Sequence, residues 1–181
     1  MVSAQAPQVA LDRSIECFRR ERVRYALIGG WALALLGRPR ATLDLDFLVL
    51  AGKEDLDRLA DRFIGSGMRR DEDWEKFNPM LYGHQVRLRW RGVAVDLLRP
   101  RDAHDEQAIV RRRRRRIGGR SCWVVAPDDF ILQKLKLGRP RDFEDALTVL
   151  ARSGKLLDRA YLRRWAKRLG LSGELDYLLS A

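Results

Sequence analysis

The fold is decided by residues 25–50, which read YALIGGWALALLGRPRATLDLDFLVL. Residues 23–28 form a short apolar run that stops at Gly29-Gly30, as a strand stops at a turn. Residues 31–36 are rich in Ala and Leu, which favour a helix, and Gly37 would end it. A strand, a glycine turn and a helix can bind phosphate, because backbone N–H groups approach an anion closely at a helix N-terminus. A simple turn is equally compatible with the pattern.

A second strand is predicted over residues 43–50. Its period of two places Asp44 and Asp46 on one face and apolar side chains on the other. These carboxylates need an explanation, because aspartate disfavours strands and is rarely buried without a partner. One explanation is a hard divalent cation such as Mg²⁺, which takes oxygen ligands. The other is that both side chains are solvated at a strand end or paired with Arg38 and Arg40.

A third carboxylate lies in a later apolar run. Residues 84–90 alternate between apolar and polar side chains, and a turn at Arg91-Gly92 predicts an antiparallel return over residues 93–98. Asp96 lies in this second strand, where a solvated aspartate is not expected.

The three carboxylates and the glycine pair together resemble the signature of the polymerase-β-like nucleotidyltransferase superfamily. Gly29-Gly30 is followed by thirteen residues and then by Asp44-Leu45-Asp46-Phe47. The resemblance implies that Asp44, Asp46 and Asp96 bind two Mg²⁺ ions, with Mn²⁺ as an alternative, and that Asp96 orients or deprotonates an acceptor hydroxyl. It further implies attack on the α-phosphate of an NTP with release of pyrophosphate.

Within the superfamily, the chain looks most like AbiEii-type toxins and minimal nucleotidyltransferases of bacteria. The similarity lies in Arg40-Ala-Thr42-Leu-Asp44, in Lys134-Leu, and in the later Arg-x-x-Asp-x-x-Asp element that ends at Asp145. It implies a set of nucleotide-binding residues, which are Gly29, Gly30, Arg38, Arg40, Thr42 and Lys134. Trp31 departs from the pattern, since many members carry a small residue or serine there.

Two parts of this later segment have plainer interpretations. Lys134 near the end of a helix is an ordinary partner of the helix dipole. Asp142 and Asp145 lie three residues apart on one helix face, where they either assist the site or pair with Arg139 and Arg141.

Composition predicts a soluble cytoplasmic protein with anionic partners. The 181 residues carry a formal net charge of +11 and no apolar stretch long enough to span a bilayer. Residues 111–116 are six consecutive arginines, which form either an exposed face or mobile loop, or a surface for phosphate backbones. Cys17 and Cys122 belong to no paired motif, so both are expected to be small buried residues.

The predicted fold is α+β, with a mixed sheet flanked by helices and a C-terminal helical cap. Residues 1–125 are assigned to the nucleotidyltransferase core and residues 126–181 to a helical extension packed on it. Helices are expected over residues 8–22 and 52–64 and from the N-cap Asp102 onward. The stretch 68–82, where periodicity fades, is expected to be a loop or an irregular hairpin.

Other chemistries lack their motifs. The chain contains no Gly-x-x-x-x-Gly-Lys-Ser/Thr, no Gly-x-Gly-x-x-Gly, no His-Glu-x-x-His and no Gly-x-Ser-x-Gly. The expected function is therefore metal-dependent transfer of an NMP to a hydroxyl of RNA or tRNA, a protein or a small molecule. The alternatives are a non-catalytic toxin–antitoxin component or an RNA-binding protein with this fold.

Overall fold

The computed structural model describes residues 5–181 and is built around one seven-stranded mixed sheet. The strand order across the sheet is β3-β4-β5-β2-β1-β7-β6. The strands are β1 Tyr25–Ile28, β2 Leu45–Val49, β3 Arg69–Arg70, β4 Gln85–Trp90, β5 Val93–Leu98, β6 Arg113–Ile117 and β7 Arg120–Val124. The sheet mixes parallel and antiparallel pairs, as the sequence predicted for an α+β protein.

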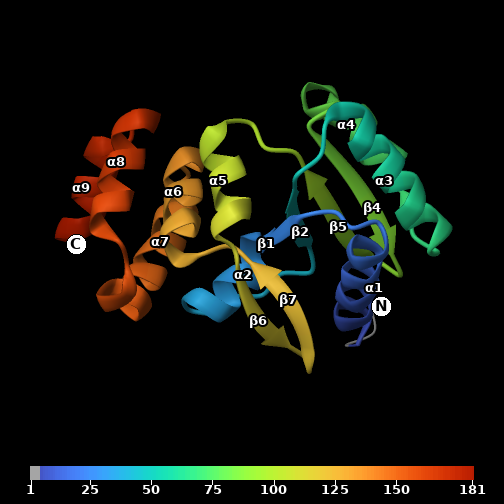
Figure 1. Cartoon of the computed structure of the whole chain (residues 1–181), viewed down its shortest axis with the longest axis horizontal. Coiled ribbons are helices and arrows are strands. Elements are labelled where there is room, and N and C mark those ends of the chain that lie inside the picture. The colour runs from blue at the N-terminus through green and yellow to red at the C-terminus, as the bar shows by residue number, and fades with distance from the viewer. Residues whose placement is uncertain (1–4) are drawn as a thin grey trace.

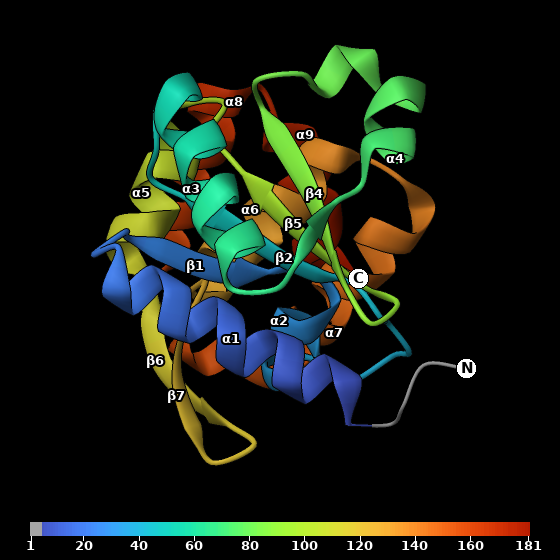
Figure 2. The same ribbon diagram turned by 90° about the vertical axis from the view of Figure 1, so that its right-hand side faces the viewer.

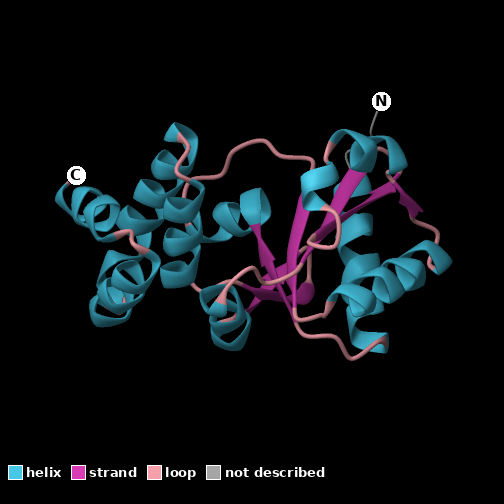
Figure 3. Ribbon diagram, turned by 90° about the horizontal axis from the view of Figure 1, so that it is seen from above, coloured by secondary structure: helices cyan, strands magenta, loops and turns pink. Residues whose placement is uncertain are grey.

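Helices cover the sheet and extend beyond it (Figure 1). They are α1 Ala6–Arg20, α2 Gly29–Leu36, α3 Lys53–Gly65, α4 Glu72–Phe77, α5 Ala103–Arg111, α6 Pro127–Leu137, α7 Pro140–Ser153, α8 Arg159–Leu169 and α9 Ser172–Ser180. Figure 3 shows α6 to α9 gathered at one end of the molecule, with α1 and α3 at the other. The division into a core of residues 1–125 and an extension of residues 126–181 stays a prediction. Within the described residues, no helix is both long and apolar enough to cross a bilayer.

The sheet register brings the glycine turn and two carboxylates to one edge. β2 pairs with β1 in antiparallel and with β5 in parallel orientation. Asp46 lies opposite Ile28 on one side and opposite Asp96 on the other. Since Gly29 follows Ile28 directly, the end of β1, the start of β2 and the middle of β5 meet at a single place.

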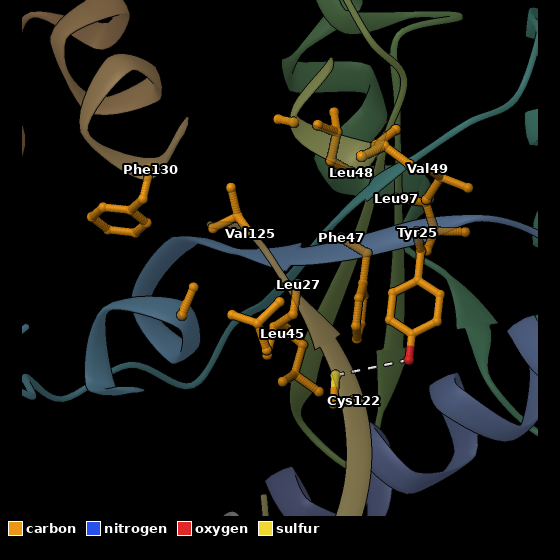
Figure 4. Packing of buried hydrophobic residues seen from close by; sticks show 14 of the residues in the cluster. Tyr25, Leu27, Leu45, Phe47, Leu48, Val49, Leu97, Cys122, Val125 and Phe130 are labelled. Atoms are coloured by element: carbon orange, nitrogen blue, oxygen red, sulfur yellow. Dashed lines mark hydrogen bonds between the residues drawn. The ribbon is translucent and has the colours of Figure 1, made fainter. Parts of the chain in front are cut away.

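The core under α1 is aromatic. Phe18 stacks on Tyr25 with ring centroids 4.3 Å apart and meets Phe47 and Phe63 edge-on. In Figure 2, α1 runs below β1, which supplies Tyr25, while Phe47 comes from the neighbouring strand β2. Figure 4 shows the same layer continuing through Leu27 and Leu45, with the Tyr25 hydroxyl bonded to the Cys122 sulfur. This packing fixes the strands that carry the carboxylates.

The stretch 68–82 corrects the sequence prediction of a loop or irregular hairpin. It contains the two-residue strand β3, the helix α4 and a 3₁₀ turn at Pro79–Leu81. The Asp71 carboxylate caps α4 by accepting a hydrogen bond of 3.3 Å from the Trp74 backbone N–H. A six-residue helix with no buried side chain leaves little periodicity in the sequence, so capping was its one readable signal.

Both cysteines should resist thiol reagents in the folded protein. They are buried, as predicted, and burial raises the pKa of each thiol to about 11. Because the thiolate is the reactive form, at pH 8 only about one thiol in 10³ would be ionised. We expect no reaction with Ellman's reagent over minutes in buffer and two equivalents per chain in denaturant. Native labelling at the rate of free cysteine would contradict this account.

Candidate active site

The residues predicted to form a site line one cavity of about 640 Å³. A cavity of this volume accommodates a nucleotide-sized ligand. Its walls come from the β1–α2 turn, the loop before β2, the loop between β5 and α5, and α6. The predicted residues on its lining are Gly29, Gly30, Arg40, Thr42, Asp44, Asp46 and Lys134.

Four predicted residues lie apart from this lining: Arg38, Asp96 and the auxiliary candidates Asp142 and Asp145. Arg38 is exposed at the surface, where its backbone N–H donates to Thr148 Oγ1 at 3.2 Å. Asp96 is buried on β5, beside Asp46.

The pKa of Asp46 is strongly raised. Burial raises the pKa of Asp46 to about 7, and the neighbouring charges of Asp96 and Asp44 add to the rise. A carboxylate so perturbed in a cavity is a common feature of functional sites. Asp44 lies directly before β2 and keeps about half of its side chain exposed, so it faces both water and the cavity.

Arg87 is the residue that sequence reasoning missed. It donates from Nε to Asp96 Oδ1 at 2.8 Å and from Nη2 to Asp96 Oδ2 at 2.6 Å. Its Nη2 also lies 3.9 Å from Asp44 Oδ2. The signal was available, because a two-residue turn at Arg91-Gly92 fixes the β4–β5 register that sets Arg87 opposite Asp96.

Gly29 and Gly30 allow the side chains of Asp46 and Thr42 to contact the backbone closely. Gly29 has a φ of 62°, in the left-handed region, and a Cβ there would collide with the Asp46 carboxylate. A Cβ at Gly30 would overlap the Thr42 side chain. The glycines therefore serve packing inside the site as well as leaving the N-terminus of α2 open to the cavity.

Replacing Gly29 with alanine should damage both fold and site. The left-handed conformation costs a non-glycine residue about 1–2 kcal/mol, and the new methyl must displace Asp46. We expect a lower melting temperature and loss of any activity that depends on Asp46. The matched control is Gly173→Ala in α9, where a Cβ meets nothing within 4 Å. Equal stability and activity of Gly29→Ala and the control would refute this role.

Lys134 lies at the centre of a buried ion cluster on the far wall. Its Nζ is 2.7 Å from Asp142 Oδ1 and 2.8 Å from Asp145 Oδ2. Asp145 also accepts two hydrogen bonds of 3.2 Å from Arg40, and Asp142 accepts one of 2.5 Å from Arg139. Burial alone would raise the pKa of both aspartates, but these partners lower it. Asp142 and Asp145 thus hold Lys134 and Arg40 at the cavity wall, and Asp142 pairs with Arg139 as one interpretation anticipated.

A second acidic group was not anticipated as a site. Asp102, His104 and Asp105 each offer a ligand atom, and these atoms lie within 4.8 Å of one another. Among the described residues, Asp44, Asp46 and Asp96 do not form so tight a group, and Asp96 is instead paired with Arg87. The Asp102 group could hold a divalent cation, but in this structure Lys136 Nζ already lies 3.0 Å from Asp102 and 2.5 Å from Asp105. Asp102 caps α5, as predicted.

Comparison with known proteins identifies the fold. No protein-family model matches the chain, and no curated protein matches it. Among solved structures, ANT(2″)-Ia in complex with adenylyl-2″-tobramycin superposes with a TM-score of 0.57 at 13% identity, covering 96% of this chain and 98% of that one. The lincosamide antibiotic adenylyltransferase LnuA, bound to lincomycin, gives 0.53 at 14% identity, covering 77% of this chain and 94% of that one.

A third solved structure agrees. A putative nucleotidyltransferase from Thermotoga maritima gives a TM-score of 0.53 at 15% identity and covers 80% of this chain and 91% of that one. Identities this low establish architecture alone. The chain has the polymerase-β-like nucleotidyltransferase fold, which confirms the predicted fold class.

Proposed function

We propose that the protein is a metal-dependent nucleotidyltransferase that moves an NMP from an NTP to an acceptor hydroxyl and releases pyrophosphate. One observation supports this most: Asp46 lies beside Asp96 on a neighbouring parallel strand and against Gly29, at a cavity, in a nucleotidyltransferase fold. The fold alone would not specify the activity. The position of the carboxylates at the cavity is the feature that supports this particular activity.

The donor set fits a hard divalent cation. Asp44 and Asp46 offer carboxylate oxygens to the cavity. The raised pKa of Asp46 comes first from its burial and then from the negative charges of Asp96 and Asp44, which Arg87 offsets only in part. Asp44 and Asp46 would hold Mg²⁺ or Mn²⁺, with Asp96 as the third ligand. When bound, the cations would neutralise charge on the attacking and leaving oxygens of the displacement.

The chain's own residues would bind and orient the substrates. The backbone at Gly29-Gly30, at the N-terminus of α2, would receive the triphosphate. Lys134 and Arg40 line the same cavity and would neutralise phosphate charge from fixed positions. Asp96 would orient or deprotonate the acceptor hydroxyl. Arg87 donates to both carboxylate oxygens of Asp96, so it must first release at least one of them.

A second candidate function is a non-catalytic role, in a toxin–antitoxin pair or as an RNA-binding protein. The observation in its favour is that charged side chains of the site are already paired with one another. Arg87 holds Asp96 through both oxygens, and Lys134 is paired with two aspartates. The resemblance of the sequence to AbiEii-type and minimal nucleotidyltransferases is compatible with both proposals.

The proposed acceptor is an RNA or tRNA, a protein hydroxyl or a small molecule. The proposed location of the reaction is the cytoplasm. Two structural neighbours are complexes with adenylyl-2″-tobramycin and with lincomycin, so tobramycin and lincomycin both belong in the test. The experiment incubates each α-labelled NTP and Mg²⁺ or Mn²⁺ with total RNA, cell protein and small acceptors. We expect label in one acceptor fraction. Label in none, above an Asp46→Asn background, would favour the non-catalytic role.

A further inference from the structure

The run of six arginines divides into two parts with different surroundings. Arg111 ends α5 and is paired with Asp128 at 3.2 Å and Asp129 at 3.0 Å, so it is structural. Arg113–Arg116 belong to β6, which is an edge strand of the sheet and exposed. In Figure 1 the β6–β7 hairpin projects from the body of the molecule. The run is therefore an exposed face, as one interpretation expected, but an ordered strand rather than a loop.

The hairpin register gathers arginines around an aromatic ring. Arg114 lies opposite Trp123 on β7, and Arg116 lies opposite Ser121, so these side chains share one face. The Arg112 and Arg114 guanidinium carbons are 4.6 and 5.6 Å from the Trp123 ring centroid. The opposite face carries Cys122 and Val124 into the core. Trp123 is half-buried, so its ring packs partly against the core and is partly open to solvent.

A fourth arginine, Arg24, lies near Arg112 at the start of the neighbouring strand β1. Arg24 is exposed directly before β1, which pairs with β7. Arg24 and Arg112 lie close enough that, after burial, the charge of Arg24 is the next cause that lowers the pKa of Arg112. We call Arg24, Arg112, Arg114 and Arg116 around Trp123 the basic platform.

The basic platform has no acidic counterpart within the chain. Across residues 5–181, none of its four guanidinium groups lies within 4.0 Å of a carboxylate, although many other arginines are so paired. Like charges held together repel, so the arrangement lowers its energy when a polyanion binds. Guanidinium groups bind phosphate and carboxylate oxygens alike through two parallel hydrogen bonds, so the choice between these anions rests on the aromatic ring beside the arginines.

We propose that the basic platform binds single-stranded nucleic acid. Alternate arginines on β6 are about 6.7 Å apart by strand rise, which spreads phosphate contacts along an extended backbone. The indole and the guanidinium planes offer stacking surfaces to unpaired bases, which a duplex would not present. The platform lies on β6 and β7, and its binding does not depend on Asp44, Asp46 or Asp96.

The test is fluorescence anisotropy with a labelled 20-nucleotide RNA of mixed sequence, titrated at several salt concentrations. The variant Arg24→Gln/Arg114→Gln/Arg116→Gln removes three exposed charges. By counterion release, three lost phosphate contacts should weaken binding about 100-fold at 0.1 M salt and make the salt slope shallower by about 2. The matched control is Arg159→Gln/Arg163→Gln/Lys167→Gln on exposed positions of α8, which removes the same charge. The control should bind nearly as the wild type does.

Three results would overturn the proposal. The first is an equal loss in the variant and its control, which would mean that net charge alone attracts RNA. The second is duplex RNA binding more tightly than the single strand. The third is polyglutamate or anionic lipid vesicles binding as tightly as RNA at matched charge and losing affinity in the same variant. The chain with Asp46→Asn should retain RNA binding, so failure of catalysis and failure of this proposal are separable.

Discussion

Replacing Asp46 with asparagine should reduce NMP transfer on the order of 10³-fold, because it removes a carboxylate ligand of the cation that would neutralise transition-state charge. Asparagine keeps the shape that packs against Gly29 and removes only the charge. The fold should not suffer. A carboxyl whose pKa is raised to about 7 destabilises the folded state as pH rises from the ordinary aspartate pKa through 7, and asparagine removes that loss. At pH 8 without metal, the variant should melt at or above the wild-type temperature.

The comparison needs a control that also neutralises one aspartate. Asp61→Asn on α3 is exposed and removes the same charge away from the cavity. Label transfer from an α-labelled NTP should persist in Asp61→Asn and disappear in Asp46→Asn. If Asp46→Asn kept more than a tenth of wild-type turnover, another group would have to carry the chemistry.

Replacing Lys134 with methionine should destabilise the fold by about 3 kcal/mol, because it removes the cation that two buried carboxylates share. Asp142 and Asp145 are nearly inaccessible, and each would keep only one arginine, Arg139 or Arg40. Urea denaturation of the metal-free protein measures the loss. The exposed Lys155→Met should change the free energy of unfolding by less than about 0.5 kcal/mol.

A rescue experiment separates charge from packing at Lys134. Adding Asp142→Asn and Asp145→Asn to Lys134→Met removes the two buried carboxylates that have lost this cation. Much of the lost stability should return, because Arg139 and Arg40, which lose their partners, are themselves partly exposed. If Lys134→Met alone unfolds within 1 kcal/mol of the wild type, the cluster does not support the cavity wall as described.

The sequence predicted those features that depend on local periodicity. Alternation placed Asp44 and Asp46 together, the turn at Arg91-Gly92 paired the strand of Asp96 with its neighbour, and Asp102 was correctly identified as an N-cap. Glycine at positions 29 and 30 was predicted to be a turn before a helix at residue 31, but both residues form the first turn of α2. The structure adds a steric reason for glycine there, which is the close approach of Asp46 and Thr42.

Contacts between distant segments could not be predicted in the same way. Lys134 is held by aspartates on the next helix, and Arg40 reaches Asp145 across 105 residues. The pairing of Arg87 with Asp96 could have been deduced from the register of the β4–β5 hairpin. The pairing of β5 with β2, which brings both residues to the site, depends on the whole sheet. Trp123 lies outside the arginine run, so only the β6–β7 pairing brings the ring beside Arg114.

The most direct test of the account asks which carboxylates hold the metal. Mn²⁺ binding, followed by electron paramagnetic resonance with a non-hydrolysable NTP, can be compared in wild type, Asp46→Asn and Asp102→Asn. The account predicts nucleotide-dependent Mn²⁺ binding in the wild type and in Asp102→Asn, where Lys136 already neutralises the second acidic group, and its loss in Asp46→Asn. Retention of Mn²⁺ by Asp46→Asn with loss in Asp102→Asn would contradict it.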